Sequence, residues 1–161
     1  MKFDAQALTD AVDVQRRERG LTWAELSREL HISTSTIKGM ASRQWGIELD
    51  GALGLARWVG RTLESFAGGD GGPPPNPADF RGGPPFSRFD ARALYAALDA
   101  ERQARGLSWD QVAREVWPAG PWGAQQLKNL AKGGRGEVRS ALAIVEWLGA
   151  NIESFTKLTM R

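Results

Sequence analysis

Residues 33–36 form a run of four hydroxyl side chains, and a single cation, Lys38, follows two positions later. Hydroxyl groups both donate and accept hydrogen bonds, and an ammonium group donates to anions. N-terminal capping of a helix accounts for Ser33 but not for the other three hydroxyl groups. This set therefore suits hydrogen bonding to the polar edges and phosphates of a nucleic acid better than it suits bond-breaking chemistry.

Catalytic and metal-binding residue types are scarce in this chain. It has no cysteine and one histidine, His31, so disulfides and Cys-based metal sites are excluded and a histidine-rich metal cluster is not expected. The carboxylates Glu25 and Glu29 belong to a helix surface rather than to a pocket with a partner that could activate water. We expect no enzyme activity, no metal and no cofactor, and we interpret His31 as a turn residue or a phosphate contact.

Two short helices are predicted to position the hydroxyl run. Thr22 and Glu25 have the spacing of a capping box, so a helix is expected to begin at this point. The apolar pattern breaks over residues 31–33, a gap that leaves room only for a tight turn. Ser33 is the predicted N-cap of the second helix, whose Ile37 is expected to face inward while Lys38 faces out.

The stretch RELHISTSTIKGMASR resembles the Xre/Cro type of lambda-repressor-like helix-turn-helix domain. It shares that family's order of an apolar residue, a turn, a serine cap, small polar residues and a buried aliphatic residue. His31 stands where the family usually has glycine, a mild departure because histidine tolerates the left-handed conformation. Trp45 lies in the loop that follows, and it either folds onto the core, which we favour, or contacts a partner.

The resemblance implies double-stranded DNA as the ligand, with the second helix in the major groove. The residues that would reach base edges are Thr34, Ser35 and Lys38. The residues that would position the phosphate backbone are Thr22, Trp23, Ser33, Thr36 and Arg43.

The chain also contains an internal repeat. FDAQALTDAVDVQRRERGLTWAELSREL, from Phe3, reappears without a gap as FDARALYAALDAERQARGLSWDQVAREV, from Phe89, with about half of the positions identical. Further along the two copies, Trp58 aligns with Trp147. Two copies separated by a linker indicate a duplicated domain rather than a solenoid.

Each copy is predicted to contain five short helices. The first begins after Asp4 or Asp90 and ends at Gly20 or Gly106. No segment shows the period-two alternation of a strand. The predicted fold class is therefore all-α, with two tandem five-helix lambda-repressor-like helix-turn-helix domains joined by a Gly/Pro-rich linker.

Composition predicts the domain boundaries. Residues 68–88 are rich in Gly and Pro and cannot continue a helix, so they are the predicted linker between a first domain, 1–67, and a second, 89–161. The linker either lets both domains reach successive major grooves or is a tether without a geometric role. Residues 3–67 carry a net charge of −1 and residues 89–161 a net charge of +2, so neither copy is an obvious polyanion binder by total charge.

The second copy departs from the first in its turn, which is expanded to WPAGPWGA. Its two prolines rule out a regular tight turn, so Trp117 or Trp122 is expected to take the place of Ile32. The helix AQQLKNLAK then presents amides and one cation suited to an adenine edge, although the same residues are good helix formers on a solvated face. The candidate DNA contacts in this copy are Gln125, Gln126, Lys128, Asn129, Lys132 and Arg135.

The sequence leaves two functions open. The first is sequence-specific double-stranded DNA binding and transcription regulation, for example as a repressor, with the tandem domains acting as a covalent pseudo-dimer. The second is a protein-interaction module, an adaptor or antitoxin-like partner, since tryptophan is enriched at binding hot spots. Without an apolar run of about 18 residues or a signal-like leader, we expect a cytoplasmic, nucleoid-associated protein with no membrane contact, and a protein partner or homodimer remains an alternative.

Overall fold

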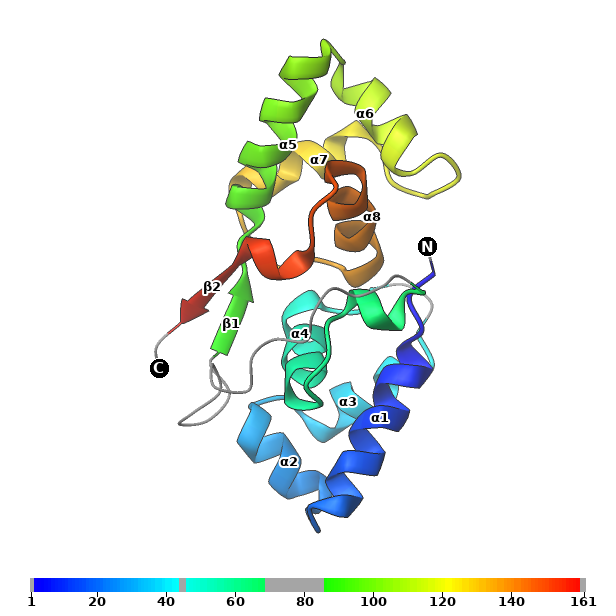
Figure 1. Ribbon diagram of the computed structural model, residues 1–161, viewed down its shortest axis with the longest axis vertical. Coiled ribbons are helices and arrows are strands. Elements are labelled where there is room, and N and C mark those ends of the chain that lie inside the picture. Colours follow the sequence, from blue (N-terminus) through cyan, green and yellow to red (C-terminus); the bar gives the residue numbers. More distant parts are fainter. Residues whose placement is uncertain (1, 44–45, 69–85, 160–161) are drawn as a thin grey trace.

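The computed structural model describes residues 2–43, 46–68 and 86–159, and this part of the chain is mostly helical, as the all-α class predicts (Figure 1). The helices of the first half are α1 (Ala5–Glu18), α2 (Trp23–Leu30), α3 (Thr34–Met40), α4 (Leu49–Trp58) and the 3₁₀-helix η1 (Glu64–Phe66). Those of the second half are α5 (Ala91–Arg105), α6 (Trp109–Val116), α7 (Ala124–Asn129), η3 (Leu130–Lys132), α8 (Val138–Leu148) and η4 (Ile152–Phe155). The second half therefore repeats the element order of the first, with η3 as an extra 3₁₀ turn after α7.

The helix ends lie at local capping signals. Each capping side chain accepts a hydrogen bond from a backbone N–H in the first turn, which would otherwise have no intrahelical partner. The caps are Asp4 for α1, Thr22 with Glu25 for α2, Ser33 for α3, Asp90 for α5 and Ser108 with Gln111 for α6. Beyond α1 and α5 the chain turns through Gly20 (φ 66°) and Gly106 (φ 67°), where a left-handed conformation favours glycine.

Each half contributes its own set of buried side chains to one continuous apolar core. The side chains at the centre are fully buried and come from the first, second and third helices of each half. They are Leu8, Leu26 and Ile37 in the first half, and Leu94, Val112 and Leu127 in the second. Burying one such side chain stabilises the fold by roughly 1.5–3 kcal/mol, so the repeated apolar positions explain why both copies adopt the same arrangement.

A small sheet corrects the expectation that no segment forms a strand. β1 (Phe86–Phe89) pairs antiparallel with β2 (Thr156–Thr159), with Phe86 opposite Thr159 and Phe89 opposite Thr156. Four-residue strands are too short to show a period-two pattern, and their pairing depends on the chain end returning beside residue 86. The predicted linker 68–88 therefore loses its last three residues to β1, while residues 69–85 and Trp45 lie outside the described part of the chain.

The two halves meet at aligned positions. Glu48 lies ten residues before Trp58, and Glu137 lies ten residues before Trp147, so the two glutamates are equivalent in the repeat. They form an antiparallel bridge with each other. Two backbone hydrogen bonds flank this bridge, from Leu49 N to Gly136 O at 2.8 Å and from Val138 N to Ile47 O at 3.0 Å.

Exchanging the two copies exchanges these two hydrogen bonds. The contact is therefore isologous, as in a two-fold symmetric dimer. Figure 1 shows the same relation, because a half-turn within the plane of the view exchanges α1 with α5 and α2 with α6, while α4 and α8 lie in the middle.

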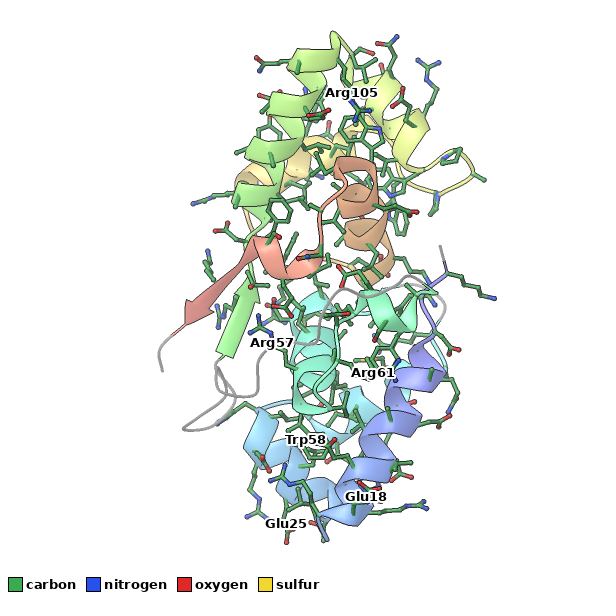
Figure 2. The ribbon with its side chains drawn as sticks, viewed as in Figure 1. Glu18, Glu25, Arg57, Trp58, Arg61 and Arg105 are labelled. Carbon is green, nitrogen blue, oxygen red and sulfur yellow. The ribbon has the colours of Figure 1, made fainter. Side chains whose placement is uncertain are left out.

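Polar side chains also cross the boundary between the halves. Arg57 of α4, labelled in Figure 2, pairs with Glu153, with Nε 3.0 Å from Oε1. The Glu64 carboxylate accepts from Ile152 N at 2.6 Å. These bonds hold α4 and η1 of the first half against η4 of the second.

One aligned pair makes this boundary asymmetric. Asp50 and Arg139 occupy equivalent positions, eight residues before Trp58 and Trp147. Asp50 accepts from Phe89 N at 2.8 Å, whereas Arg139 donates to Phe3 O at 3.2 Å. Opposite charges thus bind opposite backbone groups at the start of each copy.

Candidate nucleic-acid interface

The turn between α2 and α3 has the predicted tight geometry. His31 ends α2 in the left-handed conformation (φ 54°, ψ 35°) and is the only non-glycine residue with positive φ in the described chain. Ser27 Oγ donates to Ile32 O at 2.6 Å, which ties the turn to α2. The chain then enters α3 directly after Ser33.

The hydroxyl run forms an accessible tip at the start of α3. Ser33 Oγ accepts from Thr36 N at 3.2 Å and lies 2.6 Å from Thr36 Oγ1 and 3.3 Å from Ser35 Oγ. Ser33, Ser35 and Thr36 are exposed and Thr34 is half-buried, whereas Ile37 is fully buried. Within the described residues no carboxylate bonds to these hydroxyl groups, so the tip is open to a ligand.

Lys38 and Trp23 lie together beside this tip. The Lys38 ammonium is 5.5 Å from the centre of the half-buried Trp23 ring, and the Arg16 guanidinium is 4.4 Å from the same ring. Thr22 is exposed but committed to the capping box of α2. Arg43 is exposed after α3, as a phosphate contact requires.

The corresponding residues of the second copy are exposed but partly engaged with one another. Gln126 Oε1 accepts from Gly123 N at 2.9 Å, so this amide caps α7 in place of a side chain on residue 123. Gln125 Nε2 donates to Asn129 Oδ1 at 2.9 Å. Lys128 is exposed between them. Gln126 lies three residues after Gly123, and Asn129 lies four residues after Gln125. These i, i+3 and i, i+4 spacings are the sequence signal by which such internal bonds can be found.

The expanded turn of the second copy carries both tryptophans toward the core. Trp117 is only 7% exposed, and its ring centre lies 5.5 Å from that of the half-buried Trp122. At the expanded turn Trp117 is the buried tryptophan, while Trp122, like Ile32 in the first copy, is partly buried against the core. Pro118 and Pro121 remain exposed, so α6 and α7 are joined by a projecting loop.

α3 and α7 lie on the same side of the molecule. In Figure 1 both are on the far side, α3 behind α1 and α7 behind α5. This placement follows from the pseudo-two-fold relation between the halves, because the axis runs along the viewing direction.

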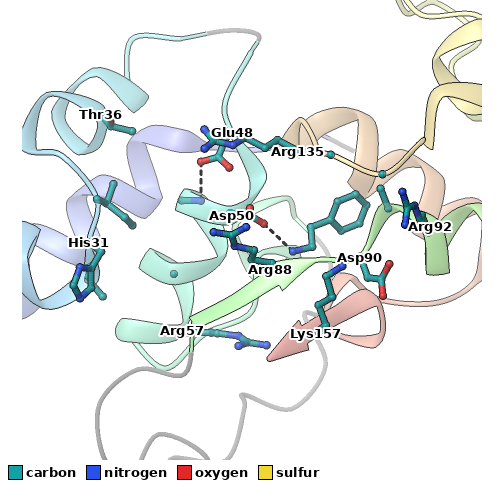
Figure 3. A pocket seen from close by; sticks show the side chains of 18 of the residues that line it. His31, Thr36, Glu48, Asp50, Arg57, Arg88, Asp90, Arg92, Arg135 and Lys157 are labelled. Atoms are coloured by element: carbon teal, nitrogen blue, oxygen red, sulfur yellow. Dashed lines mark hydrogen bonds between the residues drawn. The ribbon is translucent and has the colours of Figure 1, made fainter. Parts of the chain in front are cut away.

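Lys132 and Arg135 lie in and after η3 and are exposed. They line a groove of about 650 Å³ between the halves, which His31, Ser33 and Thr36 line from the other side (Figure 3). The sequence could not place the two cations beside the first copy's turn, since about a hundred residues separate them along the chain.

One carboxyl group at the boundary has a shifted pKa. Burial raises the pKa of Glu137 above its ordinary value of 4.5, even though the Ser140 N–H and the Arg139 charge act to lower it. Glu137 Oε2 accepts from Ser140 N at 2.8 Å, while Oε1 is buried without a partner among the described residues.

Other kinds of site are not found in the described segments. There, no group of three His, Asp or Glu side chains is arranged to hold a metal ion. Every helix in these segments is too short or too polar to cross a lipid bilayer.

Compared with models of protein families, with curated proteins and with solved structures, the chain matches none. Functional inference therefore depends on the geometry of this chain.

Proposed function

We propose that the protein binds double-stranded DNA sequence-specifically and regulates transcription, as a covalent pseudo-dimer of two lambda-repressor-like helix-turn-helix domains. The observation that carries the proposal is the isologous contact between aligned residues together with the common side of α3 and α7. Two-fold related helices on one face suit successive major grooves of one duplex.

The exposure and the chemistry of the side chains at the tip of α3 support the proposal that α3 binds the first half-site of the DNA. Thr34, Ser35 and Lys38 would read base edges, because short hydroxyl groups and one cation can form hydrogen bonds at the floor of the major groove. Ser33, Thr36 and the start of α2 would contact phosphates. Arg43 extends this contact at the far end of α3.

The second copy would make a different set of contacts. Lys128 is the accessible cation of α7, and the bonded pair Gln125 and Asn129 presents a fixed polar surface. Lys132 and Arg135 would bind phosphates near the middle of the site. The operator is therefore expected to have two unlike half-sites.

A protein-interaction module remains the second candidate, and the projecting α6–α7 loop favours it. Its Pro118 and Pro121 are exposed, and Trp117 Nε1 beneath them is buried without a hydrogen-bond partner among the described residues. Such a loop would suit a protein contact made by the second copy alone.

Selection of bound duplexes from a random pool tests the DNA proposal. We expect a recovered site with two unlike half-sites about 10–11 base pairs apart, centre to centre. Binding to that site should weaken steeply between two salt concentrations, because several phosphates are neutralised. Recovery of no enriched sequence, with little duplex binding at either concentration, would favour the protein-interaction module.

A further inference from the structure

The groove between the halves gathers positive charge, of which only Lys132 and Arg135 are among the proposed DNA contacts. Six Lys or Arg side chains line it, against three carboxylates. Arg57 is already paired with Glu153, which leaves five cations for a ligand. They are Arg88, Arg92, Lys132, Arg135 and Lys157.

The three lining carboxylates are each turned toward a backbone N–H. Glu48 accepts from Gly51 N at 3.2 Å, and Asp50 accepts from Phe89 N at 2.8 Å. Asp90 accepts from Ala93 N at 3.1 Å as the cap of α5. Among the described residues none of them forms an ion pair with a groove cation, so the excess positive charge is not neutralised internally.

Two of the cations are cross-strand neighbours on the small sheet. Arg88 and Lys157 are direct partners in the β1–β2 register, and both line the groove. Like charges at directly opposed positions of an antiparallel pair destabilise it. An anion bound between them would relieve that repulsion.

The opposite wall is built around a glycine loop. Gly133 has φ 76°, and a Cβ at this position would lie 3.3 Å from Arg92 Nε, so glycine lets this guanidinium approach the backbone closely. Arg92 also donates to Lys132 O at 3.4 Å. Lys132 and Arg135 flank the glycines, so this wall carries three cations.

The size and layout of the groove define the ligand class. A volume of about 650 Å³ lies within the range of small-molecule sites. Figure 3 shows the guanidinium groups of Arg135 and Arg88 one below the other along it. A row of cations matches a row of phosphates better than a single phosphate, because guanidinium groups bind phosphate oxygens through several N–H donors.

We infer that the groove binds a small anion with two or more linked phosphate groups, held by Arg88 and Lys157 on one wall and by Arg92, Lys132 and Arg135 on the other. The five cations all belong to the second half, and α4 of the first half also lines the groove, so the bound anion lies between the two halves. The same phosphate chemistry is present in a DNA backbone, so the test separates the two sources.

Isothermal titration calorimetry of the full chain with inorganic triphosphate, in the absence of DNA, tests the inference. Saturable one-to-one binding is expected, with inorganic phosphate at least about tenfold weaker because it spans fewer cations. The double variant Arg88→Ala with Lys157→Ala should bind triphosphate at least about tenfold more weakly. Neither residue is among the proposed DNA contacts.

The matched control is the double variant Arg17→Ala with Arg114→Ala. It removes the same charge from exposed positions outside the groove and should bind triphosphate as the unaltered chain does. The exchange variant Arg88→Lys with Lys157→Arg keeps the charge and should retain binding. Circular dichroism and thermal melting show that each variant is folded.

Three outcomes would overturn the inference. The unaltered chain could show no saturable triphosphate binding, or the control variant could lose as much binding as the groove variant. The groove variant could instead lose affinity for a random duplex while no triphosphate binding occurs, which would assign the groove to the DNA backbone. Because the titration contains no DNA, its failure leaves the proposed function standing, and failure of duplex selection leaves the triphosphate result intact.

Discussion

Lys38 is the side chain on which the proposed base contacts depend most. It is exposed on α3, and its ammonium group lies 5.5 Å from the centre of the Trp23 ring. The ring in turn stacks against Arg16, whose side chain is only 14% exposed and pairs with Asp13. This support limits the motion of a long, flexible side chain and so lowers the entropy that it loses on binding.

Lys38→Ala combined with Thr34→Ala is expected to abolish specific binding to the selected duplex. Each lost base contact costs about 1–3 kcal/mol of discrimination, whereas neither side chain belongs to the buried core. Gel-shift titration measures the affinity, and helical circular dichroism should be unchanged. Arg17→Ala, at a side chain 72% exposed on α1, is the control and should retain binding. Retained affinity in the double variant would refute the assignment of α3.

Glu137→Gln is expected to remove a pH dependence of stability. Because the pKa of Glu137 is raised in the folded chain, the folded state keeps its proton at pH values where the unfolded state has lost it. The free energy of unfolding of the unaltered chain therefore falls as pH rises from 4.5 through the raised pKa. Glutamine can still accept from Ser140 N and carries no charge, so the variant should be the more stable one above that window. Urea unfolding from about pH 4 to about pH 8 measures both curves, and equal slopes would contradict the prediction.

The segment before α8 requires a close approach of backbone and side chains. Gly136 O accepts a hydrogen bond from Leu49 N, and a Cβ at this position would lie 2.9 Å from both Leu49 Cδ2 and Phe89 Cδ1. Its aligned partner Ile47 is instead a buried apolar side chain, 2% exposed. Around the Glu48–Glu137 bridge, Gly136 thus lies opposite Leu49, and the absence of a side chain on Gly136 lets the segments before α4 and before α8 meet.

Gly136→Ala is expected to lower the free energy of unfolding by about 1–3 kcal/mol, because the added methyl group overlaps packed atoms. Gly39→Ala in α3 is the matched control, since nothing lies within 4 Å of its Cβ position. Alanine there should raise stability by up to about 1 kcal/mol through helix propensity. Chemical denaturation measures both, and two changes of the same sign would contradict the packing argument.

The boundary between the halves decides whether the chain behaves as one unit. Its contacts combine a backbone bridge at Glu48 and Glu137 with side chains that reach from one copy to the other. The opposite charges at Asp50 and Arg139 favour pairing between unlike copies, because each is matched to a different backbone group. Pairing of a first copy with a second copy is therefore favoured over pairing of two identical copies.

Arg57→Ala is expected to destabilise the chain by about 1–3 kcal/mol, because it leaves Glu153 without its partner at a largely buried boundary. The Arg57 side chain is only 10% exposed. Arg17→Ala is the control, since its ion pair with Asp13 is largely exposed and should contribute no more than about 0.5 kcal/mol. Denaturant unfolding compares the two variants, and equal effects would show that the Arg57 pair does not hold the halves together.

Local sequence determined most of the helical layout. The capping box of Thr22 with Glu25, the Ser33 cap and the inward position of Ile37 all depend on residues within four positions of one another. The left-handed turn at His31 was likewise predictable from the short gap between two apolar patterns. Because the second copy repeats most of these capping and apolar residues, the same layout could be predicted for it.

Only the tertiary structure decided how the two copies meet. The β1–β2 sheet, the Glu48–Glu137 bridge and the basic groove all join segments about 70–100 residues apart, and no local pattern encodes which of them come together. The hydrogen bond by which Gln126 accepts from Gly123 N at the start of α7 similarly depends on the backbone path of the expanded turn. The physical reason is that caps and turns are satisfied by neighbouring groups along the chain, whereas an interface forms only after whole helices have packed and left particular surfaces to face each other.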